Sequence, residues 1–426
     1  MVIKRDLKLK REIGLFEATA YGVGMILGAG IYVLIGKAAG MAGNATWLSF
    51  LIAAIVASFT GLAYAELSSM LPRSAAEYHY VKESFGSERF AFITGWLIIF
   101  VEIVATATVS LGFAGYFKSI LNAPIIPTAL CLIATLSFVN FYGIGESSKV
   151  NIAFTMLETF GLILIISLSL NSLGSVDYFE MPVGFTGVMG AAALIFFAYL
   201  GFEDVANLAE EAKKPSKTIP KALMISVAIT TILYILVAIS VVSLADWSEL
   251  GRSDAPLTLA TAGIMNPLIM SFIALFATAN TVLILLIVTS RMMYGMGVDR
   301  SLPPILAMVH AKRRTPWVAI LAVMVLSMCF VSIGDIKLVA SITDVGSLVI
   351  FALVNFSLIL LRYKRPEWKR PFKVPLNIDN QSIIPFCGLF SCMFMLLYFD
   401  PRAILLGIFM LIFGILFYQA KWWICK

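Results

Sequence analysis

Two stretches of the sequence have the residue types needed to bind a small charged molecule. The first, GVGMILGAG, holds four glycines within nine positions, and the second, FFAYLGFED, places a glycine in an aromatic run that ends in two acids. The residues concerned are Gly22, Gly24, Gly28 and Gly30 in the first stretch and Ala198, Gly201, Glu203 and Asp204 in the second. Glycine weakens a helix, and an interrupted helix leaves N–H and C=O groups that can bind opposite charges.

Two further acids, Glu158 in NIAFTMLETFGLILII and Glu102 in GWLIIFVEIVATATVSLG, stand in apolar surroundings. A carboxyl group there can exchange a proton, bind a cation, or remain neutral and bond a neighbouring helix. Thr278, Asn280 and Thr281 lie in another apolar run and can offer oxygen atoms to sodium. Polar residues in such runs more often form hydrogen bonds between helices. The residues therefore leave proton and sodium chemistry both open.

The elements that carry these residues are apolar runs long enough to cross a lipid bilayer. Of the 426 residues, 60% are hydrophobic and 13% are charged, a composition far more apolar than that of soluble domains. We predict twelve membrane-spanning helices, at 14–38, 46–70, 90–117, 125–142, 148–170, 187–210, 219–244, 267–293, 316–333, 336–361, 381–398 and 403–422. The chain is thus expected to be an all-α integral membrane protein with one membrane domain over residues 1–426.

The basic residues predict how this domain is oriented. With the N-terminus inside, 26 of the 31 Lys and Arg residues fall on the cytoplasmic side. The remaining five are Lys37, Lys118, Arg252, Lys337 and Arg402. Because positive residues gather in cytoplasmic loops, both termini are predicted to be cytoplasmic. The same distribution accounts for the net charge of +6 without a nucleic acid partner, and the five cysteines show no spacing typical of disulfides or a metal site.

The two glycine-containing stretches occupy matching depths in the predicted helices. At about 1.5 Å per residue, Gly28 lies roughly 21 Å from one end of its span and Ala198 roughly 17 Å from the opposite end. The second stretch lies in the sixth predicted span, five spans after the first, so the chain crosses there in the opposite direction and the second unit is inverted relative to the first. Paired interruptions of this kind are typical of transporter binding sites at the midplane. The alternative is helix packing, because Gly24 and Gly28 also form a small-xxx-small pair.

Seven sequence blocks resemble those of the amino acid-polyamine-organocation (APC) superfamily of permeases, with spacing similar to its cationic amino acid transporter branch. They cover nearly the whole chain in the expected order. The blocks are GMILGAGIYVLIG, NFYGIGESSKVN, FFAYLGFEDVANLAEEAKKPSKTIPKAL, SRMMYGMGVDRSLPPIL, RRTPWVAI, TDVGSLV and RPEWKRPFKVP. The resemblance implies a LeuT-like fold with a first five-helix repeat (14–170), an inverted second repeat (187–361) and two added helices (381–422). It also implies transport of amino acids across the plasma membrane by alternating access.

The resemblance also assigns a substrate site. Gly28, Ala29 and Gly30 match the unwound triplet whose N–H groups bind the substrate carboxylate. The carbonyl groups of Ile26, Phe197 and Leu200 match those that bind its ammonium group, beside the break at Gly201. The gate residues implied are Phe197, as a lid over the substrate, Tyr199 and Glu203. An amino acid would thus complete the hydrogen bonds that the broken helices lack.

The coupling ion stays open between proton, which we expect, and sodium. Glu158 and Glu102 are the candidate coupling residues, but some proton-coupled relatives have a lysine at the position of Glu158, so their mechanism cannot be transferred. Asp344 is expected to hold its helix against its neighbours, with a role in substrate choice as the alternative. A group of charged residues near the cytoplasmic ends could form a gate of salt bridges: Glu66, Arg73, Glu77, Glu210, Glu211 and Arg291.

The substrate class is expected to be neutral amino acids, because VATATVS (104–110) offers small residues toward the site. A cationic amino acid or polyamine is the alternative, since an acid such as Glu102 could face a basic side chain. The sequence contains no feature that distinguishes symport from exchange or facilitated uptake. An enzyme would need a clustered catalytic constellation and a channel a continuous polar pore, so neither is expected. No cofactor, bound metal or protein partner is predicted beyond the substrate and membrane lipid.

Overall fold

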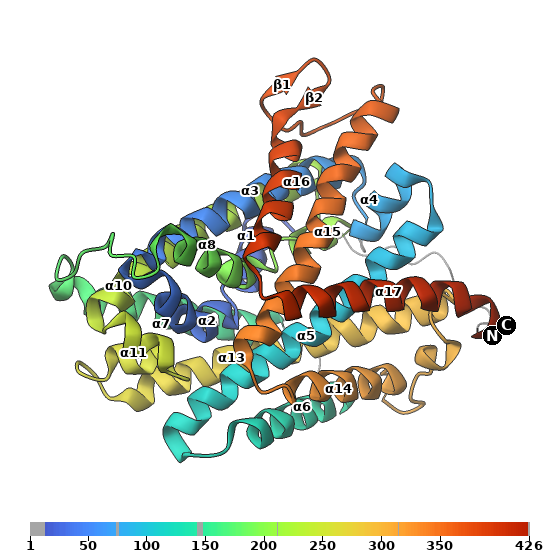
Figure 1. Ribbon diagram of the computed structural model, residues 1–426. Coiled ribbons are helices and arrows are strands. Elements are labelled where there is room, and N and C mark those ends of the chain that lie inside the picture. Colours follow the sequence, from blue (N-terminus) through green and yellow to red (C-terminus); the bar gives the residue numbers. More distant parts are fainter. Residues whose placement is uncertain (1–12, 74–75, 143–147, 211, 314, 425–426) are drawn as a thin grey trace.

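The computed structural model describes residues 13–73, 76–142, 148–210, 212–313 and 315–424 (Figure 1). This part of the chain is almost entirely helical. Its α-helices are α1 (Leu15–Ile26), α2 (Ala29–Ala42), α3 (Thr46–Met70), α4 (Ala76–Phe85), α5 (Glu88–Leu121), α6 (Ile125–Tyr142), α7 (Ser148–Ser169), α8 (Gly184–Ile195), α9 (Asp204–Asn207), α10 (Pro215–Leu244), α11 (Trp247–Arg252), α12 (Pro256–Thr261), α13 (Pro267–Val298), α14 (Trp317–Val331), α15 (Ile336–Lys364), α16 (Ile383–Met395) and α17 (Pro401–Ile424). Short 3-10 helices are η1 (Gly43–Ala45), η2 (Leu170–Ser172), η3 (Phe196–Tyr199), η4 (Leu208–Glu210), η5 (Pro304–Ala307) and η6 (Leu396–Tyr398), and one antiparallel hairpin pairs β1 (Asn377–Ile378) with β2 (Gln381–Ser382).

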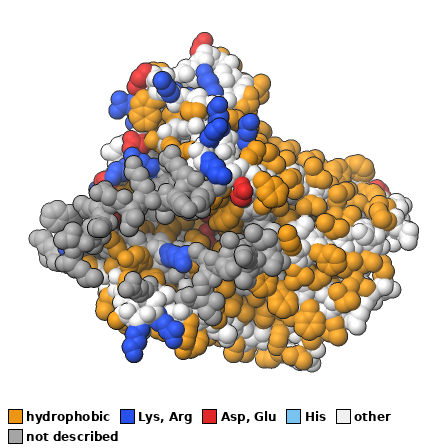
Figure 2. All heavy atoms as spheres, turned by 180° about the vertical axis from the view of Figure 1, so that it is seen from behind, with side chains coloured by type: hydrophobic (Ala, Val, Ile, Leu, Met, Phe, Trp, Pro, Cys, Tyr) orange, Lys and Arg blue, Asp and Glu red, His pale blue; other side chains and the backbone are white. Residues whose placement is uncertain are grey.

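The all-α membrane architecture predicted from the sequence is confirmed. Within the described residues, nine helical segments are long and apolar enough to cross a membrane, and three shorter apolar helices accompany them. Each of the twelve predicted ranges coincides with one or more of these helices. The number twelve and the inverted repeat stay predictions. Large apolar side chains on the outside, such as Ile232, Phe272 and Leu397, are exposed as lipid-facing residues would be. Figure 2 shows the broad hydrophobic face that results.

Helix α5 forms the centre of the bundle (Figure 1). It is buried along most of its 34 residues and packs along α13 and α15. Helix α10 packs along α3 and α1, so α1, the helix that ends just before Gly28, lies beside α10 and α3. The bundle has two ends, which we call the α4 side, where α3 and α15 end, and the α11 side, where α2 ends and α15 begins. The helices α4, α11 and α12 and the β-hairpin were not predicted, because each is too short or too polar to register as a membrane span.

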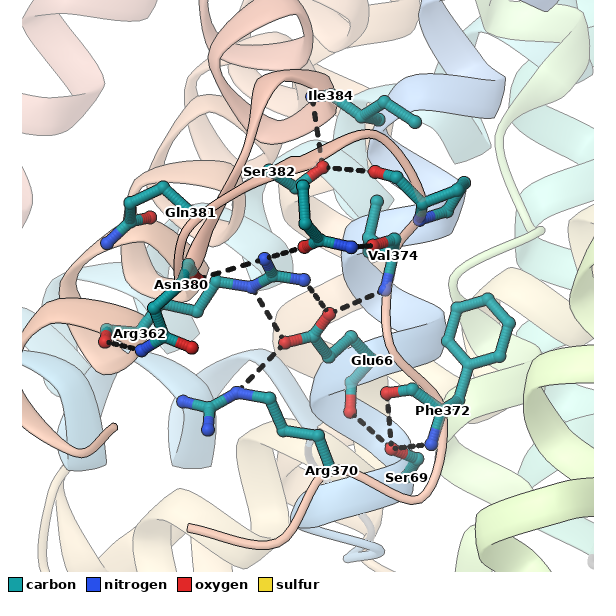
Figure 3. Close-up of polar contacts among 12 residues, drawn as sticks. Glu66, Ser69, Arg362, Arg370, Phe372, Val374, Asn380, Gln381, Ser382 and Ile384 are labelled. Atoms are coloured by element: carbon teal, nitrogen blue, oxygen red, sulfur yellow. Dashed lines mark hydrogen bonds and ion pairs between the residues drawn. The ribbon is translucent and has the colours of Figure 1, made fainter. Parts of the chain in front are cut away.

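On the α4 side, a buried cluster of charges joins the ends of α3 and α15 (Figure 3). The Nε of Arg362 donates to Oε1 of Glu66 at 2.9 Å, and its Nη2 pairs with the other carboxylate oxygen. The Nε of Arg370 lies 3.1 Å from Oε1, and the Val374 N–H donates to Oε2 at 2.8 Å. Both side chains of the Glu66–Arg362 pair are fully buried. The cluster therefore fixes α3 to α15 and to the segment that leads into the hairpin.

Candidate functional site

The first interruption lies between α1, which ends at Ile26, and α2, which begins at Ala29. The break predicted at Gly28 is thus present. Gly28 has an extended ψ of −163°, and the Ala29 N–H donates to Oγ1 of Thr281 at 3.1 Å. Because the first N–H groups of a helix have no intrahelical partner, the start of α2 presents donors at this depth.

The second interruption separates α8 from α9. Helix α8 ends at Ile195, and the chain continues through η3 before Leu200 becomes extended, with ψ of 146°. Gly201 follows with φ of +104°, a conformation that favours glycine. Its N–H donates to Oε2 of Glu203 at 2.9 Å, so this acid stabilises the break two residues before it.

The two interruptions pack directly against each other. A Cβ on Gly30 would lie 2.6 Å from the Cα of Ala198, and a Cβ on Gly201 would lie 2.9 Å from the Met25 oxygen. The hydroxyl of Tyr234 lies within hydrogen-bond distance of the carbonyl oxygens of both Ile26 and Ala198. The predicted break is therefore present, and the predicted small-xxx-small pair is also closely packed, because a Cβ on Gly24 would lie 2.7 Å from Oγ1 of Thr155 and one on Gly28 3.0 Å from Oγ1 of Thr281. Tyr234 was not predicted, because an isolated tyrosine in the apolar α10 carries no signal of its partners.

A cavity of about 80 Å³ lies where the two interruptions meet. It is lined by all seven residues predicted to bind substrate: Ile26, Gly28, Ala29, Gly30, Phe197, Leu200 and Gly201. The carboxyl residues Glu102, Glu158, Glu203 and Asp204 line it too. Apolar residues complete the wall, among them Val101, Ala105 and Leu285. The predicted residues are thus brought together around one space.

Tyr199 is the predicted gate residue that does not line this cavity. Its hydroxyl donates to the Phe50 carbonyl at 3.1 Å, and its ring packs on Tyr234 at 5.3 Å between centroids. Phe197 lines the cavity and is 7% exposed. In this conformation Tyr199 supports the second interruption from behind, whereas Phe197 faces the cavity.

Glu158 has a side-chain partner in this structure. Its carboxyl group accepts from Nδ2 of Asn280 at 3.4 Å, and its backbone carbonyl accepts from the Tyr32 hydroxyl. Thr281 accepts from the first interruption and itself donates to a carbonyl of α13. Thr278 donates within α13 and lies outside the cavity lining. Thus Asn280 and Thr281 join Glu158 at the cavity wall, and Thr278 does not.

A second cavity, of about 490 Å³, adjoins the first on the α4 side. The two share the lining residues Val101, Glu102, Glu203 and Asp204. Arg291, which is exposed, lines the outer part and links this cavity to the surface. Glu77 of α4 also lines it, and burial together with the charge of Asp204 raises the pKa of Glu77 to about 7, although the Tyr64 hydroxyl opposes this by donating to it.

The α11 side is closed by the segment from α11 to α12. A Cβ on Gly40 of α2 would lie 2.8 Å from the Cα of Gly251, so the two backbones are in contact. The Nζ of Lys37 donates to the carbonyl groups of Gly251 and Ser253 at 3.1 and 3.2 Å. Nearby, Lys118 and Asp254 form an ion pair at 3.0 Å. The small cavity therefore communicates with the α4 side and is covered on the α11 side.

Two expectations about charged residues need revision. Glu66 pairs with Arg362 and Arg370, neither of which was among the predicted gate residues. Glu211 lies outside the described residues. Asp344 was expected to bond a neighbouring helix, but in the described part of the chain neither of its carboxyl oxygens has a hydrogen-bond partner.

Comparison with known proteins identifies similar sequences along nearly the whole chain. Residues 13–418 match the family model described as amino acid permease. The chain is 31% identical to the branched-chain amino acid permease BcaP of Bacillus subtilis, over 97% of this chain and 93% of that protein. It is 29% identical to the methylthioribose transporter of the same organism, over 87% of this chain and 85% of that protein. It is also 29% identical to the cationic amino acid transporter 4 of Mus musculus, over 84% of this chain and 61% of that protein.

Proposed function

Because the chain belongs to the amino acid permease family of the APC superfamily, we propose that it carries neutral amino acids by proton-coupled symport and alternating access. The observation that supports this proposal best is the convergence of both helix interruptions on one cavity. The start of α2 offers N–H donors to a carboxylate, and Ile26 at the end of α1 lines the same cavity with a carbonyl that accepts from Tyr234 and has a second lone pair for an ammonium group. A zwitterionic amino acid matches both groups.

The rest of the cavity wall favours an apolar substrate side chain. Val101, Ala105 and Val109 of α5 line it from one side, and Ile284 and Leu285 of α13 from another. This part of the wall gives a methyl or methylene group a favourable environment. A branched-chain amino acid, which the name of the Bacillus subtilis relative indicates for that protein, fits this description.

A cationic substrate is the second candidate. Four carboxyl groups line the cavity, whereas no Lys or Arg is among its described lining residues. An amino acid with a basic side chain could pair with Glu102 or Asp204, which lie toward the α4 side. Exchange or facilitated uptake would use the same site, and sodium coupling would draw on Asn280 and Thr281.

For coupling we propose Glu158 and Glu102, with the proton as the ion. Both line the substrate cavity, so a proton on either carboxyl group can respond to an occupied site. We further propose that the α4 side is cytoplasmic, that the protein resides in the cell membrane, and that residues 14–170 and 187–361 form inverted repeats. The structure would then represent the state in which the site communicates with the cytoplasm.

The test is uptake of labelled leucine, isoleucine, valine, lysine and arginine into proteoliposomes. A pH gradient, a sodium gradient and internal amino acid are imposed separately. Gly28→Leu should abolish binding, because a Cβ at position 28 already lies 3.0 Å from Oγ1 of Thr281 and a longer side chain fills the site. Gly295→Leu is the matched control, since a Cβ at that glycine meets nothing within 4 Å.

The outcomes separate the alternatives. Accumulation of branched-chain substrates driven by the pH gradient supports the proposal, and Glu158→Gln should then abolish accumulation while sparing binding. Uptake of lysine or arginine in place of leucine would establish the cationic alternative. Transport only into preloaded vesicles would make the protein an exchanger. Unchanged affinity in Gly28→Leu would refute the location of the site.

A further inference from the structure

Asp344 is a fully buried acid in α15 that the proposed transport cycle does not yet use. Its side chain is 0% exposed. Among the described residues, neither Oδ1 nor Oδ2 has a hydrogen-bond partner. By contrast, Glu66, another fully buried acid, is paired with two arginines and a backbone N–H. Asp344 is therefore a buried acid for which this conformation provides no counter-charge.

The lack of hydrogen-bond partners and of a counter-charge determines the protonation state of Asp344. A buried carboxylate without a cation or donors is strongly unfavourable, so the group binds a proton instead. Even the neutral acid loses hydrogen bonds that it would form with water, which makes its burial unfavourable. A residue of this kind becomes favourable only if water or a partner reaches it in another state of the protein.

Two cavities approach Asp344 along α15 from opposite sides. Ser341, three residues earlier, lines a cavity of about 460 Å³ on the α11 side. Ser347, three residues later, lines the cavity of about 490 Å³ on the α4 side. Three residues correspond to about 4.5 Å along a helix and about 60° around it. Asp344 thus lies between the two cavities, on the helix face that borders both, and lines neither.

The elements packed against α15 carry several ionisable groups along the length of that helix, and none is hydrogen-bonded to Asp344. They are Tyr64 and Glu66 of α3, Glu77 of α4, Glu102 of α5, Tyr199 of η3, Cys387 and Cys392 of α16, and Arg402 of α17, with Asp335, Lys337 and Asp400 around the α11-side cavity. Helix α8 contributes no ionisable side chain over Gly184–Ile195. The acids belong mainly to the α4 side, whereas both cations of the α11-side cavity lie near its rim.

We propose that Asp344 is a proton-binding site that is reached in turn from the two cavities. In the present state the carboxyl group holds the proton. When α15 moves and water from the α4-side cavity reaches it, the O–H bond breaks, a water molecule takes the proton and the carboxylate remains. When the α11-side cavity extends to the same position, the carboxylate takes a proton from water there. This inference rests on proton-coupled transport and adds to Glu158 and Glu102 a titrating position outside the substrate cavity.

The experiment compares wild type, Asp344→Asn, Asp344→Glu and the control Asp379→Asn in proteoliposomes. Asparagine has nearly the same shape but cannot release a proton, glutamate keeps the acid, and Asp379 is exposed in the β-hairpin turn. Two uptake modes are measured: exchange of labelled for unlabelled substrate at equal pH, and accumulation driven by a pH gradient. An infrared spectrum of each protein records the C=O band of protonated carboxylic acids.

We expect Asp344→Asn to keep exchange within about twofold of wild type, to lose accumulation by tenfold or more, and to lose one protonated-carboxyl band. Asp344→Glu should retain accumulation, and Asp379→Asn should match wild type. Accumulation by Asp344→Asn at the wild-type level, or loss of exchange and accumulation together, would overturn the proposal. An unchanged infrared spectrum would overturn it whether or not the wild type transports amino acids. If the wild type lacked amino acid uptake but the band disappeared, the proposed function would fail and the proton site would stand.

Discussion

Substitution of Glu66 by glutamine tests whether the charge cluster of Figure 3 holds the α4 side together. Glutamine has the shape of glutamate but lacks its charge, and it places an NH₂ group where one oxygen now accepts. Arg362 would then lie buried without a counter-charge, although its Nη1 still donates to Asn377 and to the Asn380 carbonyl at 2.6 and 3.2 Å. The Val374 N–H, which now donates to Oε2, can lose its acceptor as well.

The magnitude follows from the burial of the pair. Removing one member of a buried, hydrogen-bonded ion pair costs about 3–5 kcal/mol, because the other charge stays desolvated. With an unfolding entropy of ~2.1 cal/mol/K per residue over 426 residues, this cost lowers the melting midpoint by about 3–6 °C. Helices persist when membrane proteins unfold in micelles, which reduces the entropy of unfolding, so about 3 °C is a lower bound.

Melting in detergent, followed by the fluorescence of a thiol-reactive dye or by near-ultraviolet circular dichroism, measures the shift. Glu367→Gln is the matched control, because Glu367 is exposed in the same loop region. The double variant E66M/R362M should recover part of the loss, since replacing both charges by apolar side chains leaves neither one unpaired. If Glu66→Gln melted within 1 °C of wild type, or if the double variant were worse than the sum of the single changes, the assigned energetic role of the cluster would be refuted.

Three further predictions concern the site and its surroundings. For Glu77, burial raises the pKa from 4.5 to about 7, so the folded state binds this proton more tightly than the unfolded state does. The stabilising effect of the protonated carboxyl group is complete below about pH 4.5 and lost by about pH 7. Glu77→Gln should therefore raise the free energy of unfolding above pH 7 by about 3 kcal/mol and make the melting midpoint less dependent on pH between 5 and 8. Tyr234→Phe removes the hydroxyl that contacts the carbonyl groups of Ile26 and Ala198 at the two interruptions. It should lower the melting midpoint by about 1–2 °C and weaken the affinity for substrate, measured at equilibrium, severalfold. Thr281→Val should tighten binding by up to about tenfold, whereas Thr281→Ser should match wild type in the same assay.

The helices were largely predictable because each is a long apolar run. The charges that end such runs, as in the loop before α5 and the one after α15, mark where the chain leaves the bilayer. Short elements were missed for a physical reason: α11 and the β-hairpin owe their conformation to what they pack against. Gly251 of α11 is in backbone contact with α2, a long-range relation that local sequence does not encode.

The site was predictable where it depends on backbone breaks. The glycines around Gly28 and Gly201 interrupt the helices and also allow the two interrupted segments to pack closely against their neighbours. The same residues in the sequence therefore indicate both a break and a close contact. Side-chain partners were not predictable, because any polar residue in an apolar helix can bond several neighbours. Asn280 illustrates this: it was a candidate sodium ligand, and the structure places its amide group on Glu158. The position of Tyr199 behind the break likewise depends on the rotation of η3, which spacing alone does not fix.

The hydrogen-bond capacity of the two interruptions explains how an empty site and a filled site can both be stable. A carbonyl oxygen has two lone pairs, so that of Ile26 can accept from Tyr234 and from a substrate ammonium group at once. An N–H group has a single hydrogen, and Thr281 already takes that of Ala29. A bound carboxylate must therefore displace the threonine hydroxyl or use the next N–H groups of α2. Because valine cannot accept that hydrogen bond, it destabilises the empty site and leaves the donor for the substrate. The threonine thus lowers affinity in exchange for a stable empty state, as a carrier that must release its substrate requires.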